Sequence, residues 1–166
     1  MNTIENLPDH KVPENINSQA ELSSLAILGL VNNPHQISMA EWTSLTRVEI
    51  TDDFSCLEGW EVKGLKWSGF RLSEVINLGK PYENARCVIV HGQDKGYQVP
   101  FPLSQAENIF LCDRLNDKNL PLEHGAPWRL IVPKGACFSS VKWVISLELT
   151  NSSGPNLGQE IALSRI

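Results

Sequence analysis

The sequence lacks the features that would place it in a membrane or a secretory pathway. No apolar run approaches the roughly 20 residues that a helix needs to cross a bilayer. The opening segment is polar and has neither the basic nor the apolar region of a signal peptide. Basic residues are also outnumbered, with 14 Lys and Arg against 19 Asp and Glu. Nucleic-acid surfaces usually carry a basic excess, so we predict that the protein does not bind nucleic acid. From the two preceding absences we predict a cytoplasmic protein that does not bind a membrane.

Several motifs of common sites are also missing. There is no GxSxG, no phosphate-binding P-loop and no GxGxxG, so the usual signatures of hydrolase and nucleotide sites are not present. Four cysteines occur, but none forms a CxxC pair, which argues against a structural zinc site. Cys87 and Cys112 stand in apolar runs, where we predict buried free thiols. Cys56 and Cys137 instead stand among turn residues.

The length of 166 residues favours a single domain. A domain of this size buries about 70% of its unfolded-chain surface, so it can fold without a metal or a disulfide. We interpret residues 1–21, which are polar and rich in Asn and Pro, as an arm. Residues 22–166 are interpreted as one domain.

Short apolar or alternating runs predict strands along most of this domain. The spacings Ser38 to Glu41 and Ser104 to Glu107 match the capping-box pattern and predict two short helices. A third helix is predicted over 71–79, and the tail is predicted as a loop followed by a turn or strand. We therefore predict an α+β domain with a mixed, partly antiparallel sheet. Strands are predicted within 25–31, 46–50, 60–69, 85–92, 99–103, 108–112, 128–133 and 140–150.

Cys56 is a candidate metal ligand or nucleophile, because it stands in a turn after a predicted strand. Its neighbours Asp52, Asp53 and Glu58 are acidic, and local negative charge raises the pKa of a thiol. An activated nucleophile is therefore disfavoured. A bound metal would reverse this argument, because the metal itself deprotonates its thiol ligand.

Three basic residues near the C-terminal end are candidates for binding an anion. His124 precedes a predicted strand, and Arg129 and Lys142 lie inside apolar runs. A guanidinium in such a run needs a partner, for which a phosphate or carboxylate offers the best geometry. The alternatives are a turn-capping histidine and internal ion pairs. The predicted core includes Trp60, Trp67, Leu72, Val75 and Trp143.

Two segments carry a resemblance to a known family. They are "CLEGWEVKGLKWSGFRLSEVINL", residues 56–78, and "NLPLEHGAPWRLIVPKGACFSSVKWVISLEL", residues 119–149. In this order they resemble the molybdopterin-binding domain of the sulfite oxidase family, over roughly residues 25–150. The resemblance implies the sulfite-oxidase-type fold, a molybdenum–molybdopterin cofactor and two-electron oxygen-atom transfer.

The resemblance also implies roles for individual residues. Cys56 matches the family's protein ligand to molybdenum, and its soft sulfur suits that metal. His124, Arg129 and Lys142 match residues near the pterin and its phosphate. A small anionic or oxo substrate and an external redox partner protein are implied as partners, because the chain shows no haem or flavin motif.

The sequence departs from the family at four positions near this site. Asp53 and Ser55 stand where bacterial relatives usually carry basic residues. Cys137 and Ser139 stand at the glycine and lysine positions of the Tyr-Gly-x-Lys-Ser loop. These departures keep an alternative open, namely a non-catalytic module on the same fold that binds a small anion or a partner.

Overall fold

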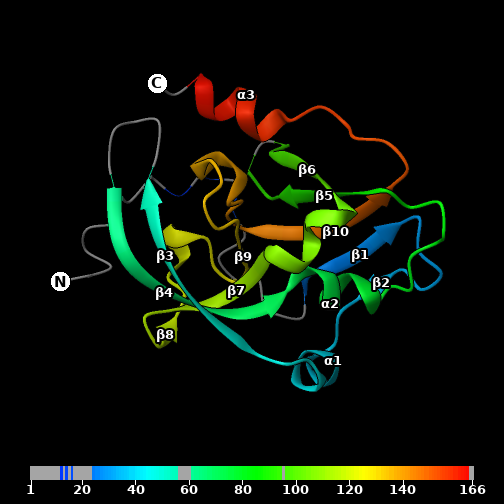
Figure 1. Ribbon diagram of the computed structural model, residues 1–166, viewed down its shortest axis with the longest axis horizontal. Coiled ribbons are helices and arrows are strands. Elements are labelled where there is room, and N and C mark those ends of the chain that lie inside the picture. Colours follow the sequence, from blue (N-terminus) through cyan, green and yellow to red (C-terminus); the bar gives the residue numbers. More distant parts are fainter. Residues whose placement is uncertain are drawn as a thin grey trace.

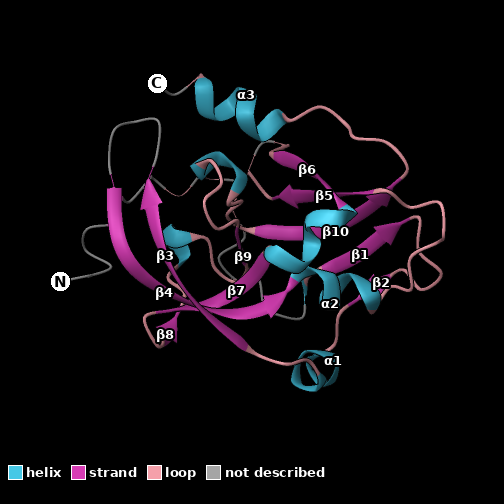
Figure 2. Cartoon of the chain, in the orientation of Figure 1, coloured by secondary structure: helices cyan, strands magenta, loops and turns pink. Residues whose placement is uncertain are grey.

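The structure is a computed structural model that describes residues 12, 14, 16, 24–55, 61–94 and 96–164. Strands dominate the described part of the chain, and they form two sheets (Figures 1 and 2). The predicted arm over 1–21 lies almost entirely outside the described residues, so its boundary stays a prediction. In the described part, no helix is long and apolar enough to span a bilayer.

The first sheet has five strands and is mixed. Its order is β2-β1-β10-β5-β6, and β1 and β10 run parallel while the other neighbours run antiparallel. The parallel pair joins strands from the two ends of the described chain, which lie side by side on the right of Figure 1. The strands are β1 (Ala26–Gly29), β2 (His35–Gln36), β5 (Cys87–Gly92), β6 (Gln98–Pro102) and β10 (Val144–Thr150).

The second sheet is antiparallel and is built on a long hairpin. Strands β3 and β4 pair from Val48 opposite Gly69 to Ser55 opposite Glu61, with an irregularity between Asp52 and Phe54. Strand β7 pairs with β4, and both β8 and β9 pair with β7. The strands are β3 (Val48–Ser55), β4 (Glu61–Arg71), β7 (Phe110–Leu115), β8 (Lys118–Asn119) and β9 (Arg129–Ile131).

Helical elements are short and connect the strands (Figure 2). Three are α-helices and three are 3-10 helices in the described residues. They are α1 (Met39–Ser44), α2 (Leu72–Asn77), η3 (Leu103–Asn108), η4 (Leu122–His124), η5 (Cys137–Ser139) and α3 (Leu157–Leu163). With mixed and antiparallel sheets, this arrangement confirms the predicted α+β class, although the strands form two sheets where one was expected.

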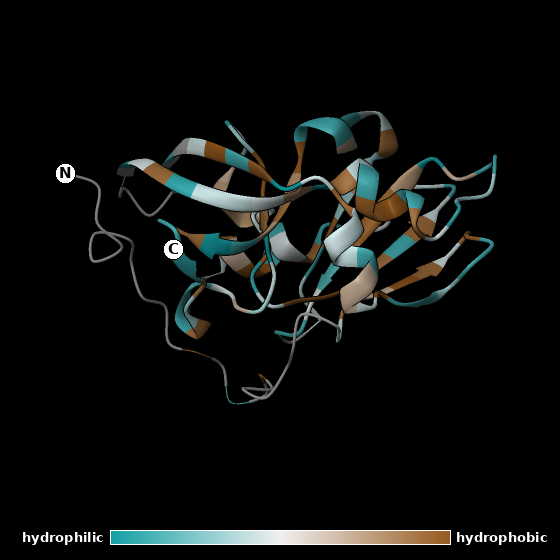
Figure 3. Ribbon diagram, turned by 90° about the horizontal axis from the view of Figure 1, so that it is seen from below, coloured by the Kyte–Doolittle hydropathy of each residue, from teal (hydrophilic) through white to brown (hydrophobic). Residues whose placement is uncertain are grey.

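Two hydrophobic clusters fill the interior. The larger joins the first sheet to α1, α2 and the aromatic pair Trp42 and Trp128, whose ring centroids lie 4.1 Å apart. The smaller lies on the second sheet and centres on Leu65, Trp67 and Ile131. Figure 3 shows hydrophobic and hydrophilic residues interspersed along the strands, as expected for strands with one buried face. Of the predicted core residues, Trp67, Leu72, Val75 and Trp143 are buried, and Trp60 lies outside the described residues.

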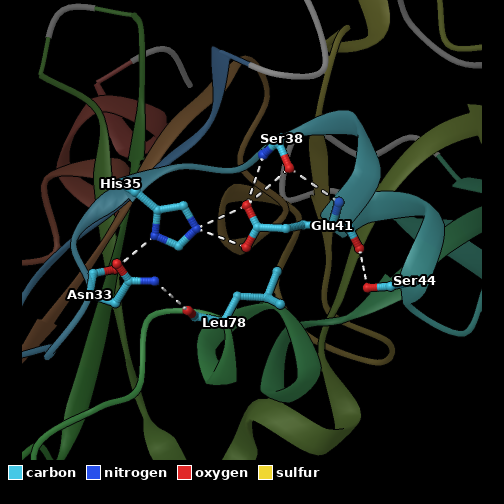
Figure 4. Close-up of polar contacts among 6 residues, drawn as sticks. All are labelled: Asn33, His35, Ser38, Glu41, Ser44 and Leu78. Carbon is cyan, nitrogen blue, oxygen red and sulfur yellow. Dashed lines mark hydrogen bonds and ion pairs between the residues drawn. The ribbon is translucent and has the colours of Figure 1, made fainter.

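The first predicted capping box is confirmed at the start of α1 (Figure 4). The Ser38 hydroxyl accepts from the Glu41 backbone N–H at 3.2 Å, and the Glu41 carboxylate accepts from the Ser38 N–H at 3.1 Å. The same carboxylate contacts the His35 ring Nε2 at 2.9 Å. The carbonyl of Asn33 and this carboxylate raise the pKa of His35, because both favour the protonated ring. Residues before α1 are thus tied to its first turn.

The second predicted capping box is wrong. Strand β6 continues to Pro102, and η3 begins directly at Leu103. Ser104 therefore lies inside the first turn, and the residue at the N-cap, Pro102, makes no side-chain cap hydrogen bond. The two prolines Pro100 and Pro102 favour the extended backbone that displaces the helix start.

The tail prediction of a turn or strand is also wrong, because residues 157–163 form helix α3. Asn156 caps it by accepting from the Gln159 N–H at 2.8 Å. Gly158 packs so closely that a Cβ atom there would lie 2.6 Å from Val99 Cγ2 and 2.7 Å from the Tyr97 ring. The helix therefore depends on docking against the first sheet, which a local sequence pattern does not reveal.

The two serines make a matched test of the first capping box. Ser38→Ala should lower the free energy of unfolding by about 1 kcal/mol, because the first turn loses its hydroxyl acceptor. Ser104→Ala should change it by less than about 0.5 kcal/mol, because this hydroxyl caps no helix. Urea denaturation of both variants measures the difference. Equal costs would contradict the assignment of Ser38 as the cap.

Candidate functional site

Three basic residues predicted to bind an anion lie on neighbouring elements. His124 ends η4, Arg129 begins β9, and Lys142 lies just before β10. His124 and Arg129 are buried, with 1% and 4% of their surfaces exposed, and Lys142 is partly buried. Lys142 was predicted inside a strand, which is wrong, because the strand starts only at Val144. The two residues before that strand instead turn toward η4.

Hydrogen bonds hold both cations against the turn formed by η4. The Arg129 guanidinium donates through Nη1 to the His124 carbonyl at 3.0 Å. The Lys142 ammonium donates to the Glu123 carbonyl at 2.9 Å. Both groups thus have their positive charge next to carbonyl oxygens of the same short helix. The structure therefore brings together the three residues that the sequence only suggested.

Trp143 fixes the same turn from the other side. Its indole N–H donates to the Leu122 carbonyl at 2.7 Å, and its backbone N–H donates to the Gly125 carbonyl at 3.0 Å. Gly125 has a φ of 115° and lies against Lys142, so that a Cβ atom would approach the Lys142 Cα to 3.1 Å. The close approach of Gly125 to Lys142 therefore requires a residue without a side chain.

Aromatic rings flank both cations. The Arg129 guanidinium lies 5.2 Å from the centre of the Trp67 ring, and the Lys142 ammonium lies 5.5 Å from that of Trp143. Both distances suit cation–π attraction. Trp67 was predicted as a core residue, and it is fully buried. The contact of Trp67 with Arg129 could not be read from the sequence, because the two residues lie on different strands, β4 and β9.

The electrostatics of the site are set by burial. Removal from water disfavours the charged guanidinium and lowers the pKa of Arg129 from 12.5 to about 10. Arg129 is therefore still protonated at neutral pH. A buried guanidinium with donors in a planar fork is well matched to a phosphate or carboxylate.

The cysteines fall into two groups. Cys87 and Cys112 are free thiols, as predicted, but only Cys112 is buried, while Cys87 is partly exposed. Burial raises the pKa of Cys112 well above its usual range, so this thiol stays protonated. Cys137 lies at the start of η5, is partly buried, and is disulfide-bonded. Nothing in the sequence signalled this bond.

Cys56, the predicted metal ligand, lies outside the described residues, so its role stays a prediction. Ser55, directly before Cys56, pairs with Glu61 at the end of the β3–β4 hairpin. Within the described ranges, no group of three or more His, Cys, Asp or Glu side chains could hold a metal. A centre with one protein thiolate does not require such a group.

The acidic residue Asp53, which departs from the family pattern, has a local structural contact. Its carboxylate accepts from the Gly64 N–H at 2.8 Å across the hairpin, and Gly64 has a φ of 67°. The contact lies next to the irregularity in the β3–β4 pairing. An aspartate at this position thus stabilises the hairpin that leads to Cys56.

Comparisons with known proteins show the family of the chain and its fold. A family model described as an oxidoreductase molybdopterin binding domain matches residues 10–157. An uncharacterized oxidoreductase, YuiH, of Bacillus subtilis (strain 168) is 29% identical over 134 residues, which cover 80% of this chain and 67% of that protein. Sulfite oxidase of Arabidopsis thaliana is 25% identical over 162 residues, covering 76% of this chain and 41% of the enzyme.

In two further matches, this chain is similar to only part of a larger protein. Nitrate reductase (NADPH) of Aspergillus niger is 30% identical over 108 residues, covering 58% of this chain and 12% of the enzyme. The crystal structure of the sulfane dehydrogenase SoxCD from Paracoccus pantotrophus superposes with a TM-score of 0.73 at 22% identity, over 81% of this chain and 40% of that one. The last match confirms the predicted sulfite-oxidase-type fold. The chain spans less than half the length of these larger proteins.

Substitutions of two glycines with positive φ, Gly96 and Gly125, test whether the close contact of Gly125 with Lys142 constrains the η4 turn. Gly96→Ala should cost about 1 kcal/mol, because its φ is 74° but no atom lies within 4 Å of an added Cβ. Gly125→Ala should cost about 2 to 4 kcal/mol, because the added Cβ also meets Lys142. Urea denaturation measures both costs. If the two substitutions were equally costly, the contact with Lys142 would not constrain the turn.

Proposed function

The chain belongs to the oxidoreductase molybdopterin-binding domain family, and from this membership we propose that it binds a molybdenum–molybdopterin cofactor. The observation that carries the proposal is the buried Arg129, held with Lys142 against η4. A pterin phosphate is an anion with several acceptor oxygens. A guanidinium group held in place and an ammonium group can both donate hydrogen bonds to the oxygens of such an anion. The residues present therefore fit the cofactor.

Each basic residue has a task in this proposal. Arg129 and Lys142 hold the phosphate, and His124 lies beside the pterin. Cation–π contacts with Trp67 and Trp143 help to keep the two cations in place. The carbonyls of η4 orient the donors before any ligand arrives, which reduces the ordering cost of binding.

Cys56 is proposed as the protein ligand of molybdenum. A thiolate is a soft donor, and bonding to the metal overcomes the acidic neighbours that would otherwise keep the thiol protonated. The cofactor, when bound, supplies two-electron oxygen-atom transfer, and the protein supplies orientation and electrostatics. In this proposal the Cys56 sulfur binds the molybdenum, while the basic residues hold the phosphate end of the cofactor.

We propose a small anionic or oxo compound as the substrate and a separate protein as the redox partner. The names of the relatives, sulfite oxidase and nitrate reductase, support oxyanions as the substrate class. The redox partner is proposed because the chain has no haem or flavin motif of its own.

A second candidate function is a non-catalytic module that binds a small anion or a partner protein. Asp53 and Ser139 favour it, because they stand where the family usually has basic residues. The contact of Asp53 with Gly64 supports a structural reason for that aspartate, so the loss of a cation at Ser139 is the stronger point. Metal analysis separates the two candidates.

Molybdenum content tests the first candidate directly. Protein produced in a host that synthesises molybdopterin should contain about one molybdenum per chain, in line with a single thiolate ligand. Cys56→Ser should lose the metal, because a hydroxyl is a much poorer ligand than a thiolate. Cys87→Ser is the control, since Cys87 is a free thiol in β5 and should leave the content unchanged. Metal-free wild-type protein from such a host would favour the second candidate.

Arg129→Met tests the basic group separately from the metal ligand. At neutral pH the buried guanidinium is charged and burial opposes that charge, so a neutral side chain removes this cost while losing the hydrogen bond to the His124 carbonyl. The free energy of unfolding should therefore change by less than about 2 kcal/mol. Retained pterin should fall about tenfold, because a charge-assisted contact is lost.

The matched control is Arg114→Met, which removes an exposed arginine from β7. It should leave both the stability and the retained pterin unchanged. Pterin fluorescence after release from the denatured protein gives the content. Equal losses in the two variants would show that Arg129 has no special part in binding.

A further inference from the structure

The ring of His35 lies between hydrogen-bond acceptors on both of its sides (Figure 4). Its Nδ1 is 2.7 Å from the Asn33 carbonyl oxygen, and its Nε2 is 2.9 and 3.1 Å from the two side-chain oxygens of Glu41. A carbonyl and an ionised carboxylate accept hydrogen bonds but cannot donate them. Both ring nitrogens therefore need a proton for both contacts to be favourable, and a ring with two protons is an imidazolium cation.

The cap of α1 keeps the Glu41 side chain ionised. Its Oε1 accepts from the Ser38 backbone N–H at 3.1 Å and from the Ser38 hydroxyl at 3.2 Å. Partial burial disfavours the charge, but the hydrogen bonds from Ser38 and His35 outweigh this effect and lower the pKa of Glu41. The proton between His35 and Glu41 therefore belongs to the histidine ring.

The contact of His35 with Glu41 joins two parts of the fold. The turn before β2 is anchored on the end of α2, because the Asn33 N–H donates to the Gly79 carbonyl at 2.9 Å. Helix α1 has only six residues, and a helix this short depends on contacts outside itself. The His35 ring thus links α1 to a turn that is already fixed on α2.

Among the described residues, Glu41 is the one charged side chain that contacts the His35 ring. The elements around the ring are α1, β10, and α2 with the segment directly after it. Glu148 on β10 instead contacts Nε2 of His91 at 2.9 Å. The protonation of His35 is therefore governed by Glu41 and by the Asn33 carbonyl. The charged residues on these elements are Glu41, Glu74, Lys80 and Glu148.

We propose that His35 is a pH-sensitive latch, which in its doubly protonated form holds α1 against the turn before β2 and releases the helix when it gives one proton to water. After that loss, one ring nitrogen carries a lone pair. This lone pair faces either the Asn33 carbonyl or the Glu41 carboxylate, at a distance set for a hydrogen bond. One of the two contacts then becomes repulsive, whichever nitrogen keeps its proton.

The direction of the pH dependence follows from the two acceptors. The Asn33 carbonyl and the Glu41 carboxylate raise the pKa of His35 above its ordinary value of 6.5. The folded protein therefore keeps this proton to a higher pH than the unfolded chain does. The stability that the latch contributes is complete below the pKa of the unfolded chain and is lost as the pH rises through that of the folded protein.

The latch reaches the proposed anion site through an aromatic contact, and this consequence rests on the proposed function. Trp42 of α1 is buried, and its ring centroid lies 4.1 Å from that of Trp128. Trp128 is also buried and directly precedes Arg129. Release of α1 weakens the packing on Trp128, so Arg129 is held less firmly. The protein should therefore retain a bound pterin better with His35 protonated.

Titration of the histidine rings by nuclear magnetic resonance tests the latch without any cofactor. The full-length protein is labelled with ¹⁵N-histidine, and the His35 signals are identified by their absence in His35→Gln. Both His35 nitrogens should be protonated at low pH, with a midpoint above 6.5. Glu41→Gln should lower the proton affinity of His35 about tenfold, because the neutral amide attracts the imidazolium less.

The matched control in this titration is Glu148→Gln. It removes the same charge from the other His–Glu pair, where His91 contacts the carboxylate through Nε2. The midpoint of His35 should stay unchanged in this variant. A wild-type midpoint at or below 6.5, or equal midpoints in Glu41→Gln and Glu148→Gln, would overturn the latch.

Hydrogen exchange measures the release of the helix. The backbone N–H of Trp42 donates to the Ser38 carbonyl at 3.1 Å in the first turn of α1. Its protection, corrected for the intrinsic effect of pH on exchange, should fall about tenfold when wild type passes from below to above the His35 midpoint. In Glu41→Gln the protection should be equally low on both sides. Protection in wild type that does not change with pH would overturn the release.

Pterin content separates this proposal from the proposed function. Protein from a host that synthesises molybdopterin is dialysed below and above the His35 midpoint. Wild type should retain about threefold more pterin below it, whereas Glu41→Gln should retain equal amounts at both pH values. Equal retention in a wild type whose His35 titrates as expected would overturn the effect on the site. No pterin in any variant at either pH would overturn the proposed function and leave the latch standing.

Discussion

The hydrogen bond from the Arg129 guanidinium to the His124 carbonyl ties the strand that carries the arginine to the turn that carries the histidine. The guanidinium is almost completely removed from water, and this burial lowers its pKa. A charge in such a position costs free energy unless its surroundings are arranged for it. Carbonyls of η4 and the ring of Trp67 provide that arrangement. The other basic residues of the site are placed by the same turn.

This arrangement explains how a small domain can prepare an anion site from distant segments. Arg129 enters through the pairing of β9 with β7, and Lys142 enters just before β10. Trp143 locks the turn between them through two hydrogen bonds. The site therefore lies where the second sheet meets the last strand of the first sheet. Family membership gives this geometry its proposed ligand, a pterin phosphate.

The sequence predicted most strands and the α+β class, because alternating and apolar runs report which residues face a core. It failed where the outcome depended on neighbours outside the pattern. Ser38 and Ser104 have the same spacing to a glutamate, yet only Ser38 caps a helix, because Pro102 holds the chain extended before Ser104. Helix α3 was missed because its stability comes from packing against β6. Lys142 was assigned to a strand because its apolar neighbours extend the pattern of β10 beyond the point where pairing begins.

For the site, the sequence by itself determined the residue types and the family. The ordered segments around Cys56, His124 and Arg129 carry that information, since they need only be present in the chain. Tertiary structure alone decided that Arg129 and Lys142 share one turn, that Trp67 lies beside the guanidinium, and that Cys137 is disulfide-bonded. The physical reason is that burial, cation–π contacts and disulfides depend on distances between segments. Those distances are set only when the two sheets pack together.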